Sequence, residues 1–195
     1  MEQSLSETHK RMLLEHARIA LEAAAERRDP PEIDLGELPE ELRQLGASFV
    51  TLTKDGALRG CIGTLEARVS LVEDVREHAR AAALHDFRFP QVQPDEVDQI
   101  LIEISILSEP EPLEYDGPDQ LLERIQPGVD GVIITEGKRR ATFLPQVWDR
   151  ISSPTLFFSM LCEKAGLQSD AWKERNLQVF TYQAETIHEE SQEKS

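Results

Sequence analysis

The sequence predicts an α+β fold in which a mostly antiparallel sheet is packed by helices. Its strand-like segments come in neighbouring pairs joined by short turns, as in β-hairpins, and do not alternate one by one with helices. Two further segments, 4–28 and 70–84, repeat apolar residues at the spacing of an amphipathic helix. The chain of 195 residues is long enough for one sizeable core with a smaller lobe, but short for two independent domains.

The first part of the chain is predicted to contain two helices with a hairpin between them. Both helices begin at a capping-box pattern, Ser4-x-x-Glu7 and Ser70-x-x-Glu73, in which a serine and a glutamate satisfy backbone N–H groups at the helix start. Lys54-Asp55-Gly56 supplies the turn of the hairpin. In chain order we expect a helix over 4–28, an acidic connector over 29–46 with a helical piece at 39–45, the hairpin over 47–65 and a helix over 70–84.

The second part of the chain is predicted to add strands and two more helices. Isoleucine stands at every second position from Ile100 to Ile106, which is the pattern of a strand with one buried face. Gly166 follows the last helix as its C-terminal cap. We expect a strand over 99–107, a helix over 119–125, a hairpin formed by 129–134 and 139–144, a helix over 156–164 and a final strand over 177–184.

We expect residues 1–188 to form a single domain whose two lobes do not fold independently. The acidic residues that follow the final strand, from Glu185 on, are typical of a frayed terminus, and we assign 189–195 to an acidic frayed tail. The N-terminus has no basic segment followed by an apolar one, and no apolar run approaches the length of a membrane span. We therefore expect a cytoplasmic protein without a signal peptide.

The composition argues against nucleic acid and membrane surfaces as partners. The formal net charge is −16, whereas binding to phosphate backbones and to anionic lipid depends on Lys and Arg. The two cysteines, Cys61 and Cys162, fall in no metal-binding spacing and are expected to be free thiols in a reducing cytosol. We find no sequence pattern for a metal site or a cofactor.

The most unusual part of the chain is a stretch with two glycines, a cation and a cysteine in six residues. This 59–64 stretch consists of Arg59, Gly60, Cys61, Ile62, Gly63 and Thr64. In a regular strand, Arg59 and Cys61 point to the same face, about 6–7 Å apart. A guanidinium at that distance favours the thiolate of Cys61, and the glycines let a ligand or another segment approach. Two interpretations remain open: a small site with a reactive thiol, and a buried structural cysteine beside a bulge.

A second candidate is the 86–90 loop, which consists of Asp86, Phe87, Arg88, Phe89 and Pro90. Exposed aromatic residues beside an acid and an arginine are typical of a recognition surface. In the alternative interpretation, the phenylalanine side chains fill the core while Asp86 and Arg88 pair with each other or with Arg59. The sequence leaves both interpretations open.

Together these segments resemble the AMMECR1 domain family, and the resemblance runs from the first helix to about His188. The matching blocks follow the family's order, at residues 49–52, 58–64, 86–90, 94–97, 102–107, 127–131, 143–148, 161–167 and 171–172. The resemblance implies an α+β fold of two unequal lobes with a cleft that carries the 59–64 stretch. It implies no reaction and no cofactor, and histidine at position 85 is not part of the family's pattern.

The resemblance also implies partners. The length of the chain is that of the prokaryotic stand-alone form, the A component of the AmmeMemoRadiSam set, which is found alongside a Memo-like protein and a radical-SAM protein. A small-molecule ligand in the cleft is a further expectation. The binding residues we predict are those of the two segments: Arg59, Gly60, Cys61, Ile62, Gly63, Thr64, Asp86, Arg88, Phe89 and Pro90.

Two functional hypotheses follow. The first is an accessory or binding protein that engages its partner through the 59–64 stretch and the 86–90 loop. The alternative is an enzyme that uses Cys61 as a nucleophile or redox thiol, with Arg59 or Arg88 holding an anionic substrate. A cysteine nucleophile needs a base, and we expect the nearest histidines in sequence, His78 and His85, on a helix surface and at a loop start. We therefore favour the binding protein.

Overall fold

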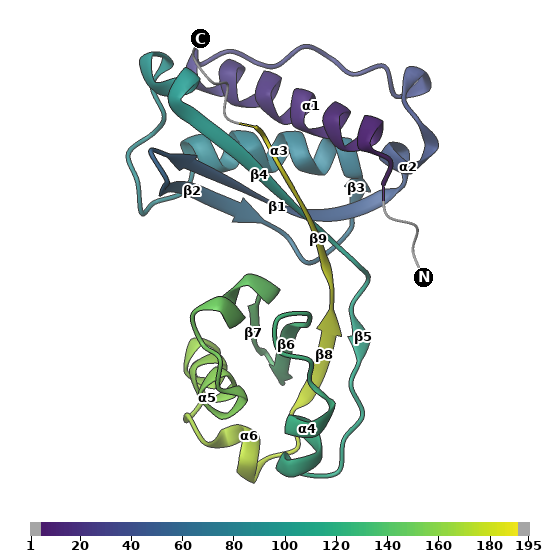
Figure 1. The fold of residues 1–195 in the computed structure, drawn as a ribbon, viewed down its shortest axis with the longest axis vertical. Helices are drawn as coiled ribbons and strands as arrows, with labels where there is room; N and C mark the ends of the chain where they lie inside the picture. The colour runs from purple at the N-terminus through teal and green to yellow at the C-terminus, as the bar shows by residue number, and fades with distance from the viewer. Residues whose placement is uncertain (1–4, 191–195) are drawn as a thin grey trace. The chain divides into compact units, whose positions relative to one another are not determined.

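The structure is a computed structural model that describes residues 5–190, and it divides the chain into two units (Figure 1). Unit 1 contains the described residues up to Leu107 and from Glu185 on, and unit 2 is Ser108–Ala184. Each unit combines helices with an antiparallel sheet. The predicted α+β fold with two unequal lobes is therefore confirmed. That the lobes do not fold independently stays a prediction.

The sheet of unit 1 has the strand order β2-β1-β4-β9. Its strands are β1 (Leu45–Lys54), β2 (Ala57–Gly63), β4 (Ile100–Leu107), β9 (Ala184–His188) and the two-residue β3 (Val69–Ser70), which pairs with the start of β1. The predicted hairpin is confirmed, because β1 turns into β2 at Asp55 and Gly56, whose φ angles of 52° and 75° suit a tight hairpin turn. Strand β2 lies at the edge of the sheet, so its outward backbone groups have no strand partner.

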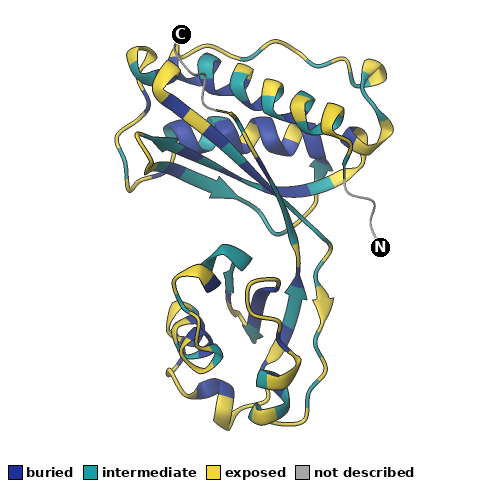
Figure 2. Cartoon of the chain, in the orientation of Figure 1, coloured by how far each residue is buried: buried dark blue, intermediate teal, exposed yellow. Residues whose placement is uncertain are grey.

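Two helices, α1 (Glu7–Ala25) and α3 (Leu71–Leu84), cover one face of this sheet (Figure 1) and turn their buried sides towards it (Figure 2). The core between them includes the predicted isoleucines of β4. Helix α3 begins at the predicted capping box of Ser70 and Glu73. Helix α1 is capped by Ser6, whose side chain accepts from the His9 N–H, so its predicted start is three residues early. Ser4, the predicted cap, lies outside the described residues.

Short helical turns fill the connecting segments of unit 1. They are η1 (Leu35–Glu37), α2 (Glu40–Arg43) and η2 (Pro94–Gln99). Under helix α3 the core also holds a polar cluster, in which Asp74 Oδ2 lies 2.6 Å from Ser48 Oγ and 3.1 Å from His78 Nδ1. All three residues are buried. The expected position of His78 on a helix surface is therefore wrong, because the acid one turn earlier gives the imidazole a partner inside the core.

Unit 2 is a four-stranded sheet with the order β5-β8-β6-β7, accompanied by helices. Its elements are β5 (Glu111–Pro112), α4 (Pro118–Arg124), β6 (Gly131–Glu136), β7 (Arg139–Phe143), η3 (Pro145–Asp149), α5 (Pro154–Lys164), α6 (Ala171–Glu174) and β8 (Gln178–Tyr182). Aromatic side chains dominate its core, where the rings of Trp148 and Phe157 stack 3.7 Å apart. Gly166, with φ of 73°, ends α5 as predicted.

The end of the chain differs from the prediction. The expected strand over 177–184 is β8 in unit 2, and a further strand, β9, follows it in the sheet of unit 1, where a frayed tail was expected. Glu189 binds the Arg18 guanidinium and accepts from the Ile102 N–H at 2.9 Å, so Glu185–Glu189 are held and not frayed. Strand β9 was not predicted because only one of its side chains, Ile187, packs into the core. Its acidic neighbours give the segment the composition of an exposed tail. Residues 191–195 of the predicted tail lie outside the described residues.

Candidate functional site

The 59–64 stretch occupies most of the edge strand β2, and a bulge interrupts it. Leu52 of β1 pairs with Gly60, and Thr53 pairs with Leu58, so Arg59 is an extra residue without a partner on β1. A bulge of this kind redirects side chains and breaks the strict alternation of a strand. The predicted common face of Arg59 and Cys61 therefore does not hold, and the two side chains have separate surroundings.

The two glycines of the stretch allow other segments of the chain to approach β2 closely. A Cβ atom at Gly60 would overlap the carbonyl oxygen of Ala82 in α3. A Cβ atom at Gly63 would overlap the ring of Phe49 and the carbonyl oxygen of Ser48, both in β1. Of the roles expected for these glycines, close approach of the backbone is the one observed.

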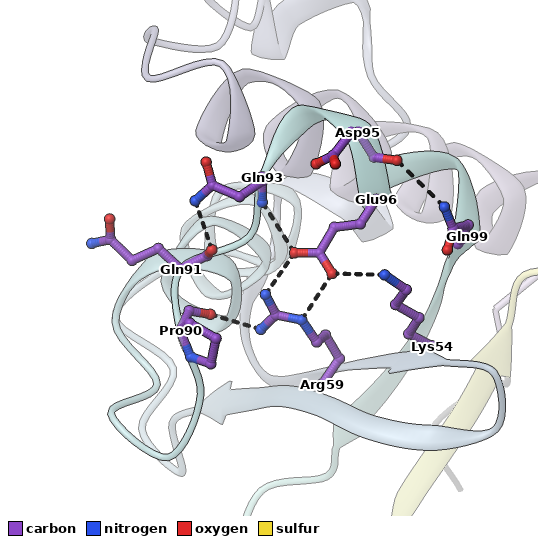
Figure 3. A network of polar contacts seen from close by, with 8 residues as sticks. All are labelled: Lys54, Arg59, Pro90, Gln91, Gln93, Asp95, Glu96 and Gln99. Carbon is purple, nitrogen blue, oxygen red and sulfur yellow. Dashed lines mark hydrogen bonds and ion pairs between the residues drawn. The ribbon is translucent and has the colours of Figure 1, made fainter.

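The Arg59 side chain belongs to a network of ion pairs beside the strand (Figure 3). Its Nε and Nη2 donate to the Glu96 carboxylate at 3.2 and 2.6 Å, and its Nη1 donates to the Pro90 carbonyl at 2.7 Å. The Lys54 ammonium lies 3.1 Å from the same carboxylate, which also accepts from the Gln93 N–H. The hydrogen bonds from Arg59 are the main cause that lowers the pKa of Glu96 to about 2. Arg59 therefore ties β2 to η2 and to the 86–90 loop.

Asp86 and Arg88 close the open edge of β2 at Cys61. The Cys61 N–H donates to Asp86 Oδ2 at 2.9 Å, and Arg88 Nη2 donates to the Cys61 carbonyl at 3.3 Å. Arg88 also binds the Asp86 carboxylate through Nε and Nη2, at 2.9 and 2.6 Å, which is the main cause that lowers the pKa of Asp86 to about 2. The predicted Asp86–Arg88 pair is confirmed. These two side chains supply the backbone partners that a neighbouring strand would otherwise provide.

The Cys61 thiol is half-buried and lies 3.4 Å from Thr51 Oγ1 on β1. Burial raises the pKa of this thiol, and that effect outweighs the lowering by the Thr51 hydrogen bond and by the charge of Arg88. The cation that acts on the thiol is thus Arg88, and not Arg59 as predicted. A thiol with a raised pKa is mostly protonated at neutral pH, which opposes nucleophilic and redox chemistry.

No histidine within the described residues is hydrogen-bonded to the Cys61 thiol. His85 is exposed at the end of α3, and His78 is bound to Asp74. The row of the sheet that contains Cys61 continues through Thr51 to Glu103 on β4, whose carboxylate lies 3.3 Å from His188 Nδ1. Sequence reasoning missed this polar row, although the alternation of β4 places Glu103 opposite the buried isoleucines.

The two phenylalanines of the 86–90 loop differ in their surroundings. The Phe87 side chain is 97% exposed, while Phe89 is half-buried with the Arg88 guanidinium 5.5 Å from its ring centre. Phe87 therefore fits the predicted recognition surface. The predicted binding residues included Phe89 and omitted Phe87, and the sequence alone does not show that Phe87 is the more exposed of the two.

Two hollows of the surface are lined by residues outside both segments. One is lined by parts of 112–115 and 176–180 in unit 2, and the other by 30–33, Leu35, Glu73 and Arg76 in unit 1. Within residues 5–190, no three His, Cys, Asp or Glu side chains are placed to hold a metal ion. None of the described helices has the length and apolar character that crossing a membrane requires.

Comparison with known proteins places the chain among archaeal relatives. The AMMECR1 family profile matches residues 14–187. A protein of Methanothermobacter thermautotrophicus is 40% identical over 192 residues, which cover 95% of this chain and 97% of that protein. Protein MJ0810 of Methanocaldococcus jannaschii is 38% identical over 77% of each chain. The crystal structure of the uncharacterized protein PH0010 from Pyrococcus horikoshii superposes with a TM-score of 0.87 at 32% identity, over 95% of this chain and 94% of that one. This chain therefore belongs to the AMMECR1 family, as its matching blocks predicted.

Proposed function

We propose that this AMMECR1-family protein is a binding protein that recognises a partner protein through the 86–90 loop. The observation that carries the proposal is the Phe87 side chain, which is 97% exposed on a loop that is otherwise tied to the fold. Aromatic residues are enriched among the interface residues that contribute most to binding energy. Exposing an apolar side chain of this size to water is unfavourable in free energy, and a partner that covers the side chain recovers this free energy.

The loop is held in position from both sides. Asp86 binds β2 at Cys61, and the Pro90 carbonyl accepts from Arg59. Beyond the loop, the Val92 N–H donates to the Ala83 carbonyl at 2.9 Å in helix α3. A loop that is ordered before the partner arrives loses little conformational entropy on binding, so the contact of Phe87 translates into affinity. The role we assign to the 59–64 stretch is to support this loop.

The partners we propose are the Memo-like protein and the radical-SAM protein that the family resemblance implies, in the cytoplasm of the same cell. The formal net charge of −16 opposes nucleic acid and anionic membranes as competing partners. A small-molecule ligand beside the 59–64 stretch is a further expectation from the resemblance. The geometry of the stretch does not select any particular ligand.

The enzyme alternative has less support from the geometry. In its favour, the charge of Arg88 and the Thr51 hydrogen bond both lower the pKa of the Cys61 thiol. Against it, burial raises that pKa further than they lower it, and the guanidinium groups proposed to hold an anionic substrate are bound to Glu96 and Asp86. We therefore prefer the binding function to catalysis at Cys61.

The test is the affinity of the Phe87→Ala variant for the Memo-like and radical-SAM proteins of the same organism, measured by calorimetry. We expect the affinity for one of them to fall about tenfold or more, because truncation of a central aromatic contact has this effect in interfaces. The matched control is Val129→Ala, which truncates an apolar side chain that is 43% exposed in unit 2. Equal affinities of the wild type and the Phe87→Ala variant for both partners would overturn the proposal.

A further inference from the structure

Helix α3 carries a buried arginine without a counter-ion. Arg76 is only 8% exposed, and its one recorded hydrogen bond within residues 5–190 runs from Nη2 to the Pro31 carbonyl. No carboxylate of the described residues lies within ion-pair distance of this guanidinium, although unit 1 is rich in acidic residues. Buried charges in proteins are normally paired, so an unpaired guanidinium in this position needs an explanation.

The unpaired guanidinium borders a hollow in the surface of unit 1. The hollow has a volume of about 400 Å³ and is bounded on one side by Arg76 and Glu73 of α3. The connector between α1 and α2 forms the other side, mostly with apolar residues: Pro30, Pro31, Ile33 and Leu35, together with Glu32. A volume of this order accommodates a small organic molecule. The Glu73 carboxylate accepts from the N–H and the hydroxyl of Ser70 in the capping box, and no ion pair joins it to Arg76.

A half-buried imidazole that is influenced by the charge of Arg76 is found on α1. The pKa of His16 on α1 is lowered, first by burial and second by the charge of Arg76, while Glu15 raises it. His16 Nδ1 is buried and has no hydrogen-bond partner among the described residues. The buried Nδ1 of His16 and the guanidinium of Arg76 without a counter-ion would both be stabilised by a negative charge placed at Arg76.

We infer that the hollow beside Arg76 binds a small carboxylate with an apolar body. The planar guanidinium suits a carboxylate, which it holds through paired, charge-assisted hydrogen bonds. The prolines, Ile33 and Leu35 then cover the apolar part of the ligand. A compact inorganic anion leaves that apolar surface uncovered. The site lies apart from the 86–90 loop and is independent of the function proposed for it.

The probe is benzoate, titrated into the full chain while the imidazole signals of the five histidines are followed by NMR across pH. The His16 signal is assigned with the His16→Gln variant. Benzoate is expected to bind with a millimolar dissociation constant and to raise the pKa of His16, because the anion offsets the charge of Arg76. Benzyl alcohol, which has the same ring without the charge, is expected to bind about tenfold more weakly or worse.

The variant that tests the residue is Arg76→Met, which is expected to weaken benzoate binding about tenfold or more. Its control is Arg80→Met on the same helix, because Arg80 already has a counter-ion, Asp29, at 2.8 Å. Equal binding of benzoate and benzyl alcohol to the wild type would overturn the inference without any variant. Unchanged affinity in the Arg76→Met variant, or tighter binding of inorganic phosphate than of benzoate, would overturn it as well.

Discussion

Lowering the pH from about 7 to about 2 is expected to remove about 5 kcal/mol from the free energy of unfolding of unit 1 through Asp86 and Glu96 alone. Both carboxylates have a pKa of about 2 in the folded protein, below the ordinary values of 3.8 and 4.5. The unfolded chain therefore takes up protons first as the pH falls. The stabilisation is complete above about pH 5 and disappears as the pH falls through about 2. Both carboxylates are largely buried, and water screens the Arg59–Glu96 pair less than the Arg88–Asp86 pair, whose arginine side chain is 47% exposed.

The measurement is urea unfolding at a series of pH values, followed by far-UV circular dichroism. This signal reports mainly on α1 and α3 in unit 1, whereas fluorescence reports on unit 2, which contains both tryptophans. The Glu96→Gln and Asp86→Asn variants are less stable than the wild type at neutral pH, and this difference shrinks as the pH falls. The Asp29→Asn variant, which breaks an exposed ion pair, is the control. Parallel pH curves for the wild type and the Glu96→Gln variant would refute the prediction.

Replacing Gly60 with alanine is expected to destabilise unit 1 by about 3 kcal/mol. The added Cβ atom overlaps the carbonyl oxygen of Ala82, which is backbone of helix α3 and cannot rotate away as a side chain does. Strand β2 and helix α3 must therefore separate, which also disturbs the packing of Ile62 against the core. The loss is measured by urea unfolding with the same circular dichroism signal.

The matched control is Gly56→Ala in the turn of the same hairpin. Gly56 has φ of 75° and open space where a Cβ atom would lie, so this substitution costs only backbone strain of about 1 kcal/mol. If the free energy of unfolding falls much more for Gly60→Ala than for Gly56→Ala, the cause is the close packing at Gly60 and not the general effect of removing a glycine. Similar losses at the two positions would show that the approach of α3 to β2 does not require glycine.

The elements that the sequence predicted correctly are those with strong local signals. The hairpin turn at Asp55 and Gly56, the capping box of Ser70 and the alternating isoleucines of β4 each depend on residues close in sequence. Strand β9 was missed because it depends on a partner about 80 residues away, and its acidic residues outweighed the signal of Ile187.

In the candidate site, the sequence identified the segments but not their chemistry. The bulge at Arg59 arises from pairing with β1, and no feature of the six residues shows which of them lacks a partner. Glu96 attracts Arg59 from 37 positions away, and Asp86 reaches Cys61 from 25 positions away. The long-range ion pair with Glu96 takes Arg59 away from Cys61, and the local pair with Asp86 places Arg88 beside Cys61 instead. The exposure of Phe87 likewise follows from how the loop is tied down.

The most direct test of the account is the reactivity of the Cys61 thiol towards iodoacetamide at neutral pH. The signal of Cys61 is isolated by comparison with the Cys61→Ala variant, since the other cysteine, Cys162, is fully buried. If the 59–64 stretch supports a recognition loop, Cys61 is expected to react more slowly than cysteine in a short peptide, because burial raises the pKa of its thiol. The Cys61→Ala variant is also expected to keep its affinity for the partner protein. Alkylation faster than that of the peptide, with a thiol pKa below the ordinary value, would contradict the account and favour catalysis at Cys61.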